Sequence, residues 1–189
     1  MKNRGNNRLS PEFVLLGFLY QSPSHGYELH HRLLDVFGNL WHSSQSQTYN
    51  ILKRLENQGY IHSTCIEQEK LPARQLLRIS GSGLERFETW LALPTRSSVH
   101  AIRVEFITRL YFTQLYFPAR TQAMIQTQAE MVRTDLSQLK QQLEKYPDKQ
   151  AINRMALELR IELLSSVTHW LDSCREAIQA TPVNGQENE

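Results

Sequence analysis

Residues 43–61 read Ser-Ser-Gln-Ser-Gln-Thr-Tyr-Asn-Ile-Leu-Lys-Arg-Leu-Glu-Asn-Gln-Gly-Tyr-Ile, and this stretch decides the fold. Ser44, followed three residues later by Gln47, forms a capping box, which predicts the start of a helix. Gly59 can adopt the left-handed conformation that ends a helix. The stretch therefore predicts one short helix between Ser44 and Gly59.

The two faces of this predicted helix have opposite chemistries on a wheel of about 100° per residue. The inward side carries Thr48, Ile51, Leu52 and Leu55. The outward side carries Ser46, Gln47, Asn50, Lys53, Arg54 and Asn57, with Tyr49 at the border. Amides, a hydroxyl and cations without a central carboxylate suit base edges and phosphates. On this helix alone, contact with DNA and ordinary solvation both stay open.

The residues upstream predict two further helices. Ser10-Pro11-Glu12 is a helix start, and the run 13–20 that follows is apolar on every side, so it must be covered on more than one face. A second helix runs from about Gly26 to Gly38. Its expected buried stripe is Leu29, Leu33, Val36 and Phe37. Helix, turn, helix and capped polar helix is the order of a helix-turn-helix core.

Two β-branched segments downstream predict a hairpin wing. The strands are expected at 61–68 and 74–80, with a break at 69–73 that contains a proline. Lys70 and Arg74 at its tip are placed to meet phosphate, although surface solubility is the alternative explanation. A helix from about 82 to 93 closes the domain. Its expected inward residues are Leu84, Phe87, Trp90 and Leu91.

The second half predicts three helices after a linker at 93–98. They cover 99–116, a segment that starts at Pro118, and a last segment that ends near Ala180. The main apolar stripe of the last helix is Ile152, Met155, Ala156, Leu159, Leu163, Val167, Trp170, Cys174 and Ile178, with Leu157, Ile161, Leu164 and Leu171 outside it. One stripe can pack on the neighbouring helix, but a second apolar side requires a second partner. We therefore expect self-association through Leu159, Leu163, Val167 and Trp170.

Bulk properties limit the classes of function. Residues 1–98 hold 11 Lys and Arg against 8 Asp and Glu, whereas residues 99–189 hold 10 against 11, so the positive excess lies with the helix-turn-helix half. Neither a bilayer-spanning segment nor an apolar signal core is expected. Cys65 and Cys174 suggest no metal motif, and a reduced cytoplasmic setting is the default. No strained nucleophile turn or glycine-rich phosphate loop is visible, so we expect neither an enzyme nor a cofactor.

The sequence resembles the PadR-type transcriptional regulators, a winged-helix family. The resemblance covers nearly the whole chain. It rests on Leu9-Ser10-Pro11-Glu12-Phe13, on His25-Gly26-Tyr27-Glu28-Leu29, on Tyr49 with 52–56, Gly59 and Ile61, on 77–80 with Gly83, and on 103–106. Many members are similar to a Gly- or Pro-containing start of the recognition helix, where this chain has Ser46 and Asn50. The resemblance implies a DNA-binding homodimer, usually a repressor, sometimes released by a small molecule.

These observations predict a mainly α protein with three parts: a winged helix-turn-helix domain at 1–94, an antiparallel helical dimerisation domain at 95–180 and a flexible tail at 181–189. The expected function is repression by a homodimer on an inverted-repeat operator. The expected DNA-binding residues are Ser44, Ser46, Gln47, Tyr49, Asn50, Lys53, Arg54, Lys70 and Arg74. The resemblance also makes Trp90 and Trp170 candidates for a pocket that binds a small aromatic effector. An activator of the same fold and a helical adaptor that does not bind DNA are the alternatives.

Overall fold

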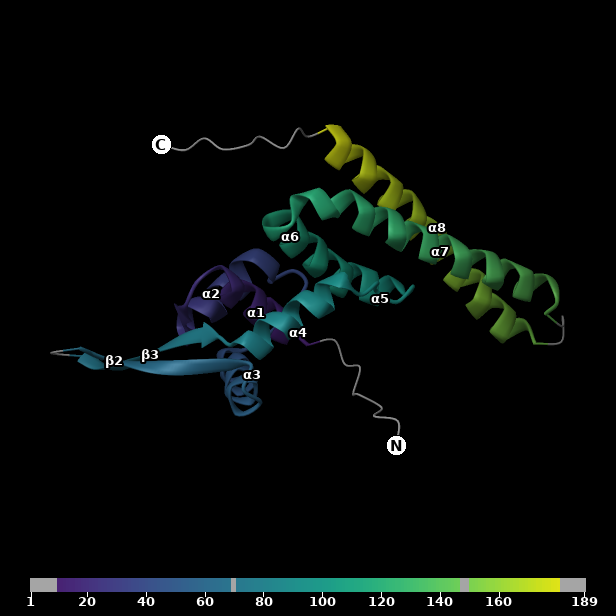
Figure 1. Cartoon of the computed structure of the whole chain (residues 1–189). Coiled ribbons are helices and arrows are strands. Elements are labelled where there is room, and N and C mark those ends of the chain that lie inside the picture. Colours follow the sequence, from purple (N-terminus) through teal and green to yellow (C-terminus); the bar gives the residue numbers. More distant parts are fainter. Residues whose placement is uncertain (1–9, 69–70, 147–149, 181–189) are drawn as a thin grey trace. The chain divides into compact units, whose positions relative to one another are not determined.

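The computed structural model describes residues 10–68, 71–146 and 150–180. The chain divides into two compact units, Met1–Leu93 (unit 1) and Pro94–Glu189 (unit 2). Unit 1 contains α1 (Glu12–Gln21), β1 (Ser24–His25), α2 (Gly26–Phe37), α3 (Gln45–Asn57), β2 (Ile61–Gln68), β3 (Leu71–Ile79) and α4 (Gly81–Ala92) (Figure 1). This order confirms the predicted fold class, a winged helix-turn-helix with a small β-hairpin.

The first helix, α1, is the core of unit 1. Residues 14–19 are all buried, as a run that is apolar on every side requires. The helices α2, α3 and α4 and strand β3 all pack against it. The helix start predicted at Ser10-Pro11-Glu12 is confirmed: α1 begins at Glu12, and Pro11 precedes it without a side-chain capping bond.

The sheet has three strands in the order β1-β3-β2, all antiparallel. The two-residue β1 was not predicted, because Ser24 and His25 show no strand pattern of their own and pair only with Leu77 and Leu76. Strand β3 begins earlier than predicted and includes Pro72. Since β1 pairs only near the other end of β3, Pro72 lies where that edge of β3 has no neighbouring strand, a position that tolerates proline.

Two side chains expected in the core of unit 1 lie on its surface. Val36 on α2 and Leu84 on α4 are exposed, whereas Leu29, Leu33 and Phe87 are buried as predicted. The apolar face predicted from the sequence is broader than the surface that neighbouring helices and strands cover. Residues at the edge of that face therefore remain exposed to solvent.

In the described residues of unit 2, all regular secondary structure is helical. Its elements are α5 (Val99–Ala101), η1 (Ile102–Phe106), α6 (Ile107–Tyr116), η2 (Pro118–Arg120), α7 (Thr121–Glu144) and α8 (Ala151–Ala180). The predicted helix 99–116 is continuous, but its η1 segment is a π-helix, a wider turn that sequence periodicity does not reveal.

The linker that enters unit 2 is fixed by a buried polar cluster. The side-chain amide of Gln128 on α7 accepts from the backbone N–H of Thr95 and donates to its carbonyl, both at 2.8 Å. Arg109 donates to the Thr95 hydroxyl at 3.1 Å and to the Glu105 carboxylate at 2.6 Å. Burial lowers the pKa of Arg109, and the charge of Glu105 opposes that shift.

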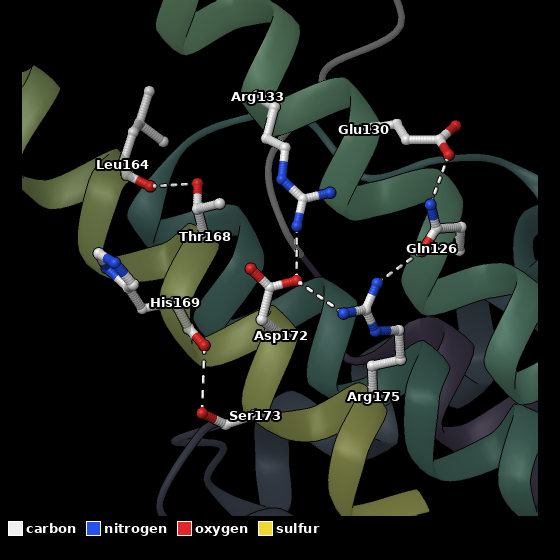
Figure 2. Close-up of polar contacts among 9 residues, drawn as sticks. All are labelled: Gln126, Glu130, Arg133, Leu164, Thr168, His169, Asp172, Ser173 and Arg175. Carbon is white, nitrogen blue, oxygen red and sulfur yellow. Dashed lines mark hydrogen bonds and ion pairs between the residues drawn. The ribbon is translucent and has the colours of Figure 1, made fainter. Parts of the chain in front are cut away.

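The helices α7 and α8 run antiparallel and side by side (Figure 1). Their apolar contact is reinforced by a surface network in which Asp172 on α8 accepts from Arg133 on α7 and pairs with Arg175 (Figure 2). Arg175 also donates to Gln126 of α7 at 3.3 Å. The hydrogen bond from Arg133 lowers the pKa of Asp172 below its usual range. These partly exposed bonds add to the apolar contact between the two helices.

The face of α8 that packs inside the unit is the smaller apolar side of the helix and not its main stripe. Leu157, Leu164 and Leu171 are buried in the cluster with α7, and Ile161 packs against them. The residues left exposed, called here the apolar stripe of α8, are Ile152, Met155, Leu159, Leu163 and Trp170. The main stripe of the sequence is therefore largely uncovered in the single chain, and its supposed second side forms the core.

Candidate nucleic-acid interface

The N-terminus of α3 is built by the predicted capping box. The backbone N–H of Gln47 donates to Ser44 Oγ at 3.2 Å, and the backbone N–H of Ser44 donates to Gln47 Oε1 at 2.9 Å. Two backbone donors that the helix leaves unsatisfied thus gain partners. At the other end Gly59 has φ +74°, in the left-handed region. The helix bounds follow directly from these local signals.

The inner face of α3 is anchored to α2 by apolar and polar contacts. Leu52 and Leu55 are buried, and Thr48 is fully buried beside them. The Thr48 hydroxyl lies 3.0 Å from Nδ1 of the buried His30 and 3.3 Å from the Ser44 carbonyl oxygen, to which it donates. His30 therefore has a structural role in holding the start of α3 in place.

The outer face of α3 is exposed along its whole length. Five exposed side chains of α3 are called here the polar face of α3: Ser46, Gln47, Asn50, Lys53 and Asn57; Arg54 is exposed as well. Glu56, the acid of α3, is half-buried and accepts a hydrogen bond from the Ser63 hydroxyl on β2 at 2.5 Å. The centre of the polar face thus carries one cation and hydrogen-bonding groups, and no acid.

A groove of about 860 Å³ borders this helix on the side of Tyr49. Its lining comes from the start of α2, from α3 and from β3: His25, Gly26, Tyr27, Tyr49, Asn50, Leu52, Lys53, Glu56, Gln75 and Leu77. Gly26 allows the Tyr49 ring to lie close, because a Cβ there would come within 3.0 Å of Tyr49 Cε1. Asn50 and Lys53 belong both to this groove and to the polar face of α3.

The groove wall opposite α3 is held by hydrogen bonds at the start of α2. The Glu28 carboxylate accepts from the backbone N–H of His25 at 2.9 Å and from the Ser24 hydroxyl at 2.8 Å. The bond from the His25 backbone is the main cause of the lowered pKa of Glu28. Nδ1 of His25 lies 2.8 Å from the carbonyl oxygen of Gln75 on β3. Sequence reasoning missed His25, Tyr27 and Gln75 as neighbours of α3, since only the fold brings them together.

Arg54 differs from its neighbours on α3 because it already has a carboxylate partner. Its Nη2 donates to Glu12 Oε2 at 2.9 Å. Glu12 lies at the start of α1, and no local sequence signal links it to α3. The structure thus brings Ser46, Gln47, Asn50 and Lys53 together on an open face and places Arg54 in an ion pair at its flank.

The two cations predicted at the wing tip both have side chains outside the described part of the chain. Lys70 as a whole is outside the described residues. Arg74 belongs to β3, where its backbone pairs with Ile66 of β2. Their role at phosphate stays a prediction.

The two tryptophans expected near an effector have different surroundings. Trp90 is buried, and its ring stacks on Phe13 with centroids 4.5 Å apart and planes 3° from parallel. One face of Trp90 is therefore already covered. Trp170 remains more than one third exposed and meets Phe106 edge to face at 6.1 Å. Neither tryptophan lines the groove beside α3.

The four predicted self-association residues differ in how much of them is already covered. Val167 is partly buried and packs against the cluster between α7 and α8, and its part in self-association stays a prediction. Leu159, Leu163 and Trp170 lie on the apolar stripe of α8, as an outward-facing contact would require. Val167 lies one step round the helix from that stripe, and the sequence could not distinguish the two positions.

Metal-binding and membrane-spanning features are both missing from the described part of the chain. Within the described ranges, no group of three His, Cys, Asp or Glu side chains is arranged to hold a metal ion. None of the described helices is long and apolar enough to cross a membrane.

Comparison with known protein families finds two matches that follow each other along the chain. Residues 15–89 match the transcriptional regulator PadR-like family, and residues 102–179 match the family described as virulence activator alpha C-term. The first match covers α3 and the wing, and the second covers α7 and α8.

Individual proteins are also similar to this chain. A Mycobacterium tuberculosis protein named "Probable transcriptional regulator" is 31% identical over 84 residues, which span 44% of each chain. The Bacillus subtilis negative transcriptional regulator PadR is 24% identical over 135 residues, or 71% of this chain and 73% of the relative. A crystal structure of Bacillus subtilis PadR with operator DNA aligns over 88% of this chain and 98% of that one, with 22% identity and a TM-score of 0.42.

Proposed function

Because the chain belongs to the PadR-like family of transcriptional regulators, which bind DNA and are not enzymes, we propose that the polar face of α3 reads the bases of its operator. One observation carries this proposal: α3 has an uncovered face of amides, a hydroxyl and one lysine, with the acid of α3 turned toward β2. Such a face suits the major groove, where base edges offer donors and acceptors beside phosphates.

The residues of this face take different roles in the proposal. Asn50 can bind adenine through two hydrogen bonds, and Gln47 and Ser46 lie one turn closer to the helix start. Gln47 keeps its amide nitrogen for a base, because the capping box uses its oxygen. Lys53 and Tyr49 hold phosphate, joined by Lys70 and Arg74 of the wing. Ser44 acts at the interface indirectly, by fixing the first turn of α3.

The second part of the proposal is a homodimer formed through the apolar stripe of α8. Full burial of an exposed leucine contributes roughly 1.5–3 kcal/mol. Leu159 is 56% and Leu163 is 43% exposed, so a contact that covers both on both copies gains about half of that for each leucine. A twofold dimer presents two α3 helices, which demands an inverted-repeat site with half-sites about 34 Å apart.

The third part concerns regulation. We propose that the dimer represses by covering a promoter, which the negative role in the name of the Bacillus subtilis relative supports. An activator of the same fold would differ only in where its operator lies. A small aromatic effector, if it binds next to a tryptophan, has an open ring surface at Trp170 but a covered one at Trp90. A regulator of this kind works beside DNA, so the cytoplasmic setting expected from the sequence remains our prediction.

The apolar stripe of α8 also favours one competing function. A helical adaptor could use that stripe to bind a different protein and use no DNA at all. A salt titration of binding to random-sequence duplex DNA separates the two. The proposed regulator binds with an affinity that falls steadily with salt, because neutralised phosphates release counterions. An adaptor shows neither affinity nor salt dependence, and that result would reject the proposal.

A further inference from the structure

One carboxylate joins three helices of unit 1. Glu12 Oε2 accepts from Arg54 Nη2 of α3 at 2.9 Å, and Glu12 Oε1 accepts from Arg86 Nη2 of α4 at 2.6 Å. The Glu12 side chain is only 13% exposed. Charge-assisted bonds of this kind are stronger than neutral ones, and partial burial shields them from salt.

The α4 side of this bridge is held by aromatic rings. The Arg86 guanidinium lies 4.6 Å from the Tyr60 ring centroid and 5.2 Å from that of Phe13, which follows Glu12 in α1. It also donates to the Tyr60 hydroxyl at 3.4 Å. Arg86 and Glu12 are therefore fixed to the scaffold, and Arg54 links α3 to this fixed point.

Adjacent cations on α3 thus differ in what surrounds them. Lys53 has no ion-pair partner within the residues that the structure describes, and it opens onto the groove and the polar face of α3. Arg54 is 49% exposed, yet its guanidinium would have to abandon a carboxylate in order to meet a phosphate. Sequence alone gives both residues the same role.

We propose that Glu12 is a positioning residue that keeps Arg54 as a brace between α3 and α1, so that Arg54 orients the reading helix while Lys53 neutralises phosphate. This inference rests on the proposed function, in which α3 contacts DNA. It goes further by dividing the α3 cations into one that binds and one that aligns. Loss of the Glu12 charge releases Arg54 toward the phosphates, which strengthens sequence-blind binding and weakens discrimination.

The test measures binding of the full-length chain to random duplex and to its preferred duplex over a series of salt concentrations. Lys53→Ala is expected to reduce the slope of log K against log [salt] by about 0.9 for each phosphate that Lys53 neutralises. Arg54→Ala is expected to keep the wild-type slope but to lower the ratio of preferred to random affinity. Glu12→Gln, which keeps the side-chain shape, is expected to raise the slope by about 0.9 per protomer.

The double variant Glu12→Gln/Arg54→Ala serves as the control, because its slope returns to the wild-type value only if the extra phosphate in Glu12→Gln is bound by Arg54. The proposal is overturned if Arg54→Ala reduces the salt slope as much as Lys53→Ala does. It is also overturned if Glu12→Gln keeps the wild-type salt slope. Arg54 is half-exposed, so its variant gives an answer even if Glu12→Gln does not fold. If the wild-type chain does not bind random duplex, the proposed function itself is rejected. Equal loss of slope in Lys53→Ala and Arg54→Ala rejects only the proposed division of roles between these two cations.

Discussion

The helices α3 and α8 each leave one face uncovered, and the two faces have opposite chemistries. The polar face of α3 offers amides and a lysine, whereas the apolar stripe of α8 offers Leu159, Leu163 and other hydrophobic side chains. The first suits a charged, hydrated partner whose binding weakens with salt. The second suits another apolar surface, whose burial depends little on salt. The proposal thus assigns to one chain two interfaces that respond to different variables.

The largest expected effect comes from a charge placed on the apolar stripe of α8. Leu163→Arg removes a buried leucine from the dimer and forces a cation into its place, which should weaken self-association roughly 100-fold or more. Sedimentation is expected to find monomers while unit 1 keeps its helical signal. Leu115→Arg on α6 is the matched control, since Leu163 is 43% and Leu115 is 44% exposed. Dimers that persist in Leu163→Arg would move the interface to another surface.

The next effect concerns base recognition by α3. Asn50→Ala is expected to relax discrimination at one position in each half-site, at a cost of about 1–3 kcal/mol for the preferred base. Competition binding against single-base variants of the preferred duplex measures this. Gln114→Ala alters an exposed amide on α6 of unit 2, outside the proposed reading surface, and is expected to leave the preference unchanged. Unaltered base preference in Asn50→Ala would remove Asn50 from the reading surface.

A smaller effect separates capping from contact at Ser44. Ser44→Ala removes the bond to the Gln47 backbone and should lower the free energy of unfolding by about 1 kcal/mol, measurable by urea denaturation. Ser44→Asp restores a cap and stability but brings a negative charge to the helix start that faces DNA. We expect it to fold like the wild type and bind duplex more weakly. Full stability in Ser44→Ala would contradict the capping role.

The smallest expected effect is that of Lys53 on DNA affinity, and it is measured through the salt dependence of binding. Lys53→Ala should weaken binding to all duplexes alike and reduce the salt slope by about 0.9 for each phosphate that is no longer neutralised. Dimerisation, measured across the same salt range, is expected to stay constant, because the apolar stripe of α8 contains no charge. A strong salt dependence of dimerisation would show that the two interfaces are not distinct in this way.

The same pair of helices shows what sequence can and cannot predict. Local signals were sufficient for α3: a cap at Ser44, a stop at Gly59 and a single aliphatic side specified its ends and its orientation. For α8 they were insufficient, because apolar residues occur on two sides. The side that packs inside the chain is decided by apolar contacts with α7, which do not follow from the periodicity of α8.

Pairings between distant residues were the other feature beyond prediction. Strand β1 exists because Ser24 and His25 find Leu77 and Leu76, and Arg54 meets Glu12 because the fold brings α3 against α1. In each case neither partner carries a local signal. Candidate site residues could therefore be predicted from their residue type and their position on a helix face. The residues that they contact could be identified only from the structure.

The most direct test of the account is selection of preferred duplexes from a random pool by the full-length chain at fixed salt. The account predicts enrichment of an inverted repeat whose half-sites lie about 34 Å apart along one face of the duplex, as twin copies of α3 require. Recovery of no preferred sequence, or of one site without twofold symmetry, would contradict it.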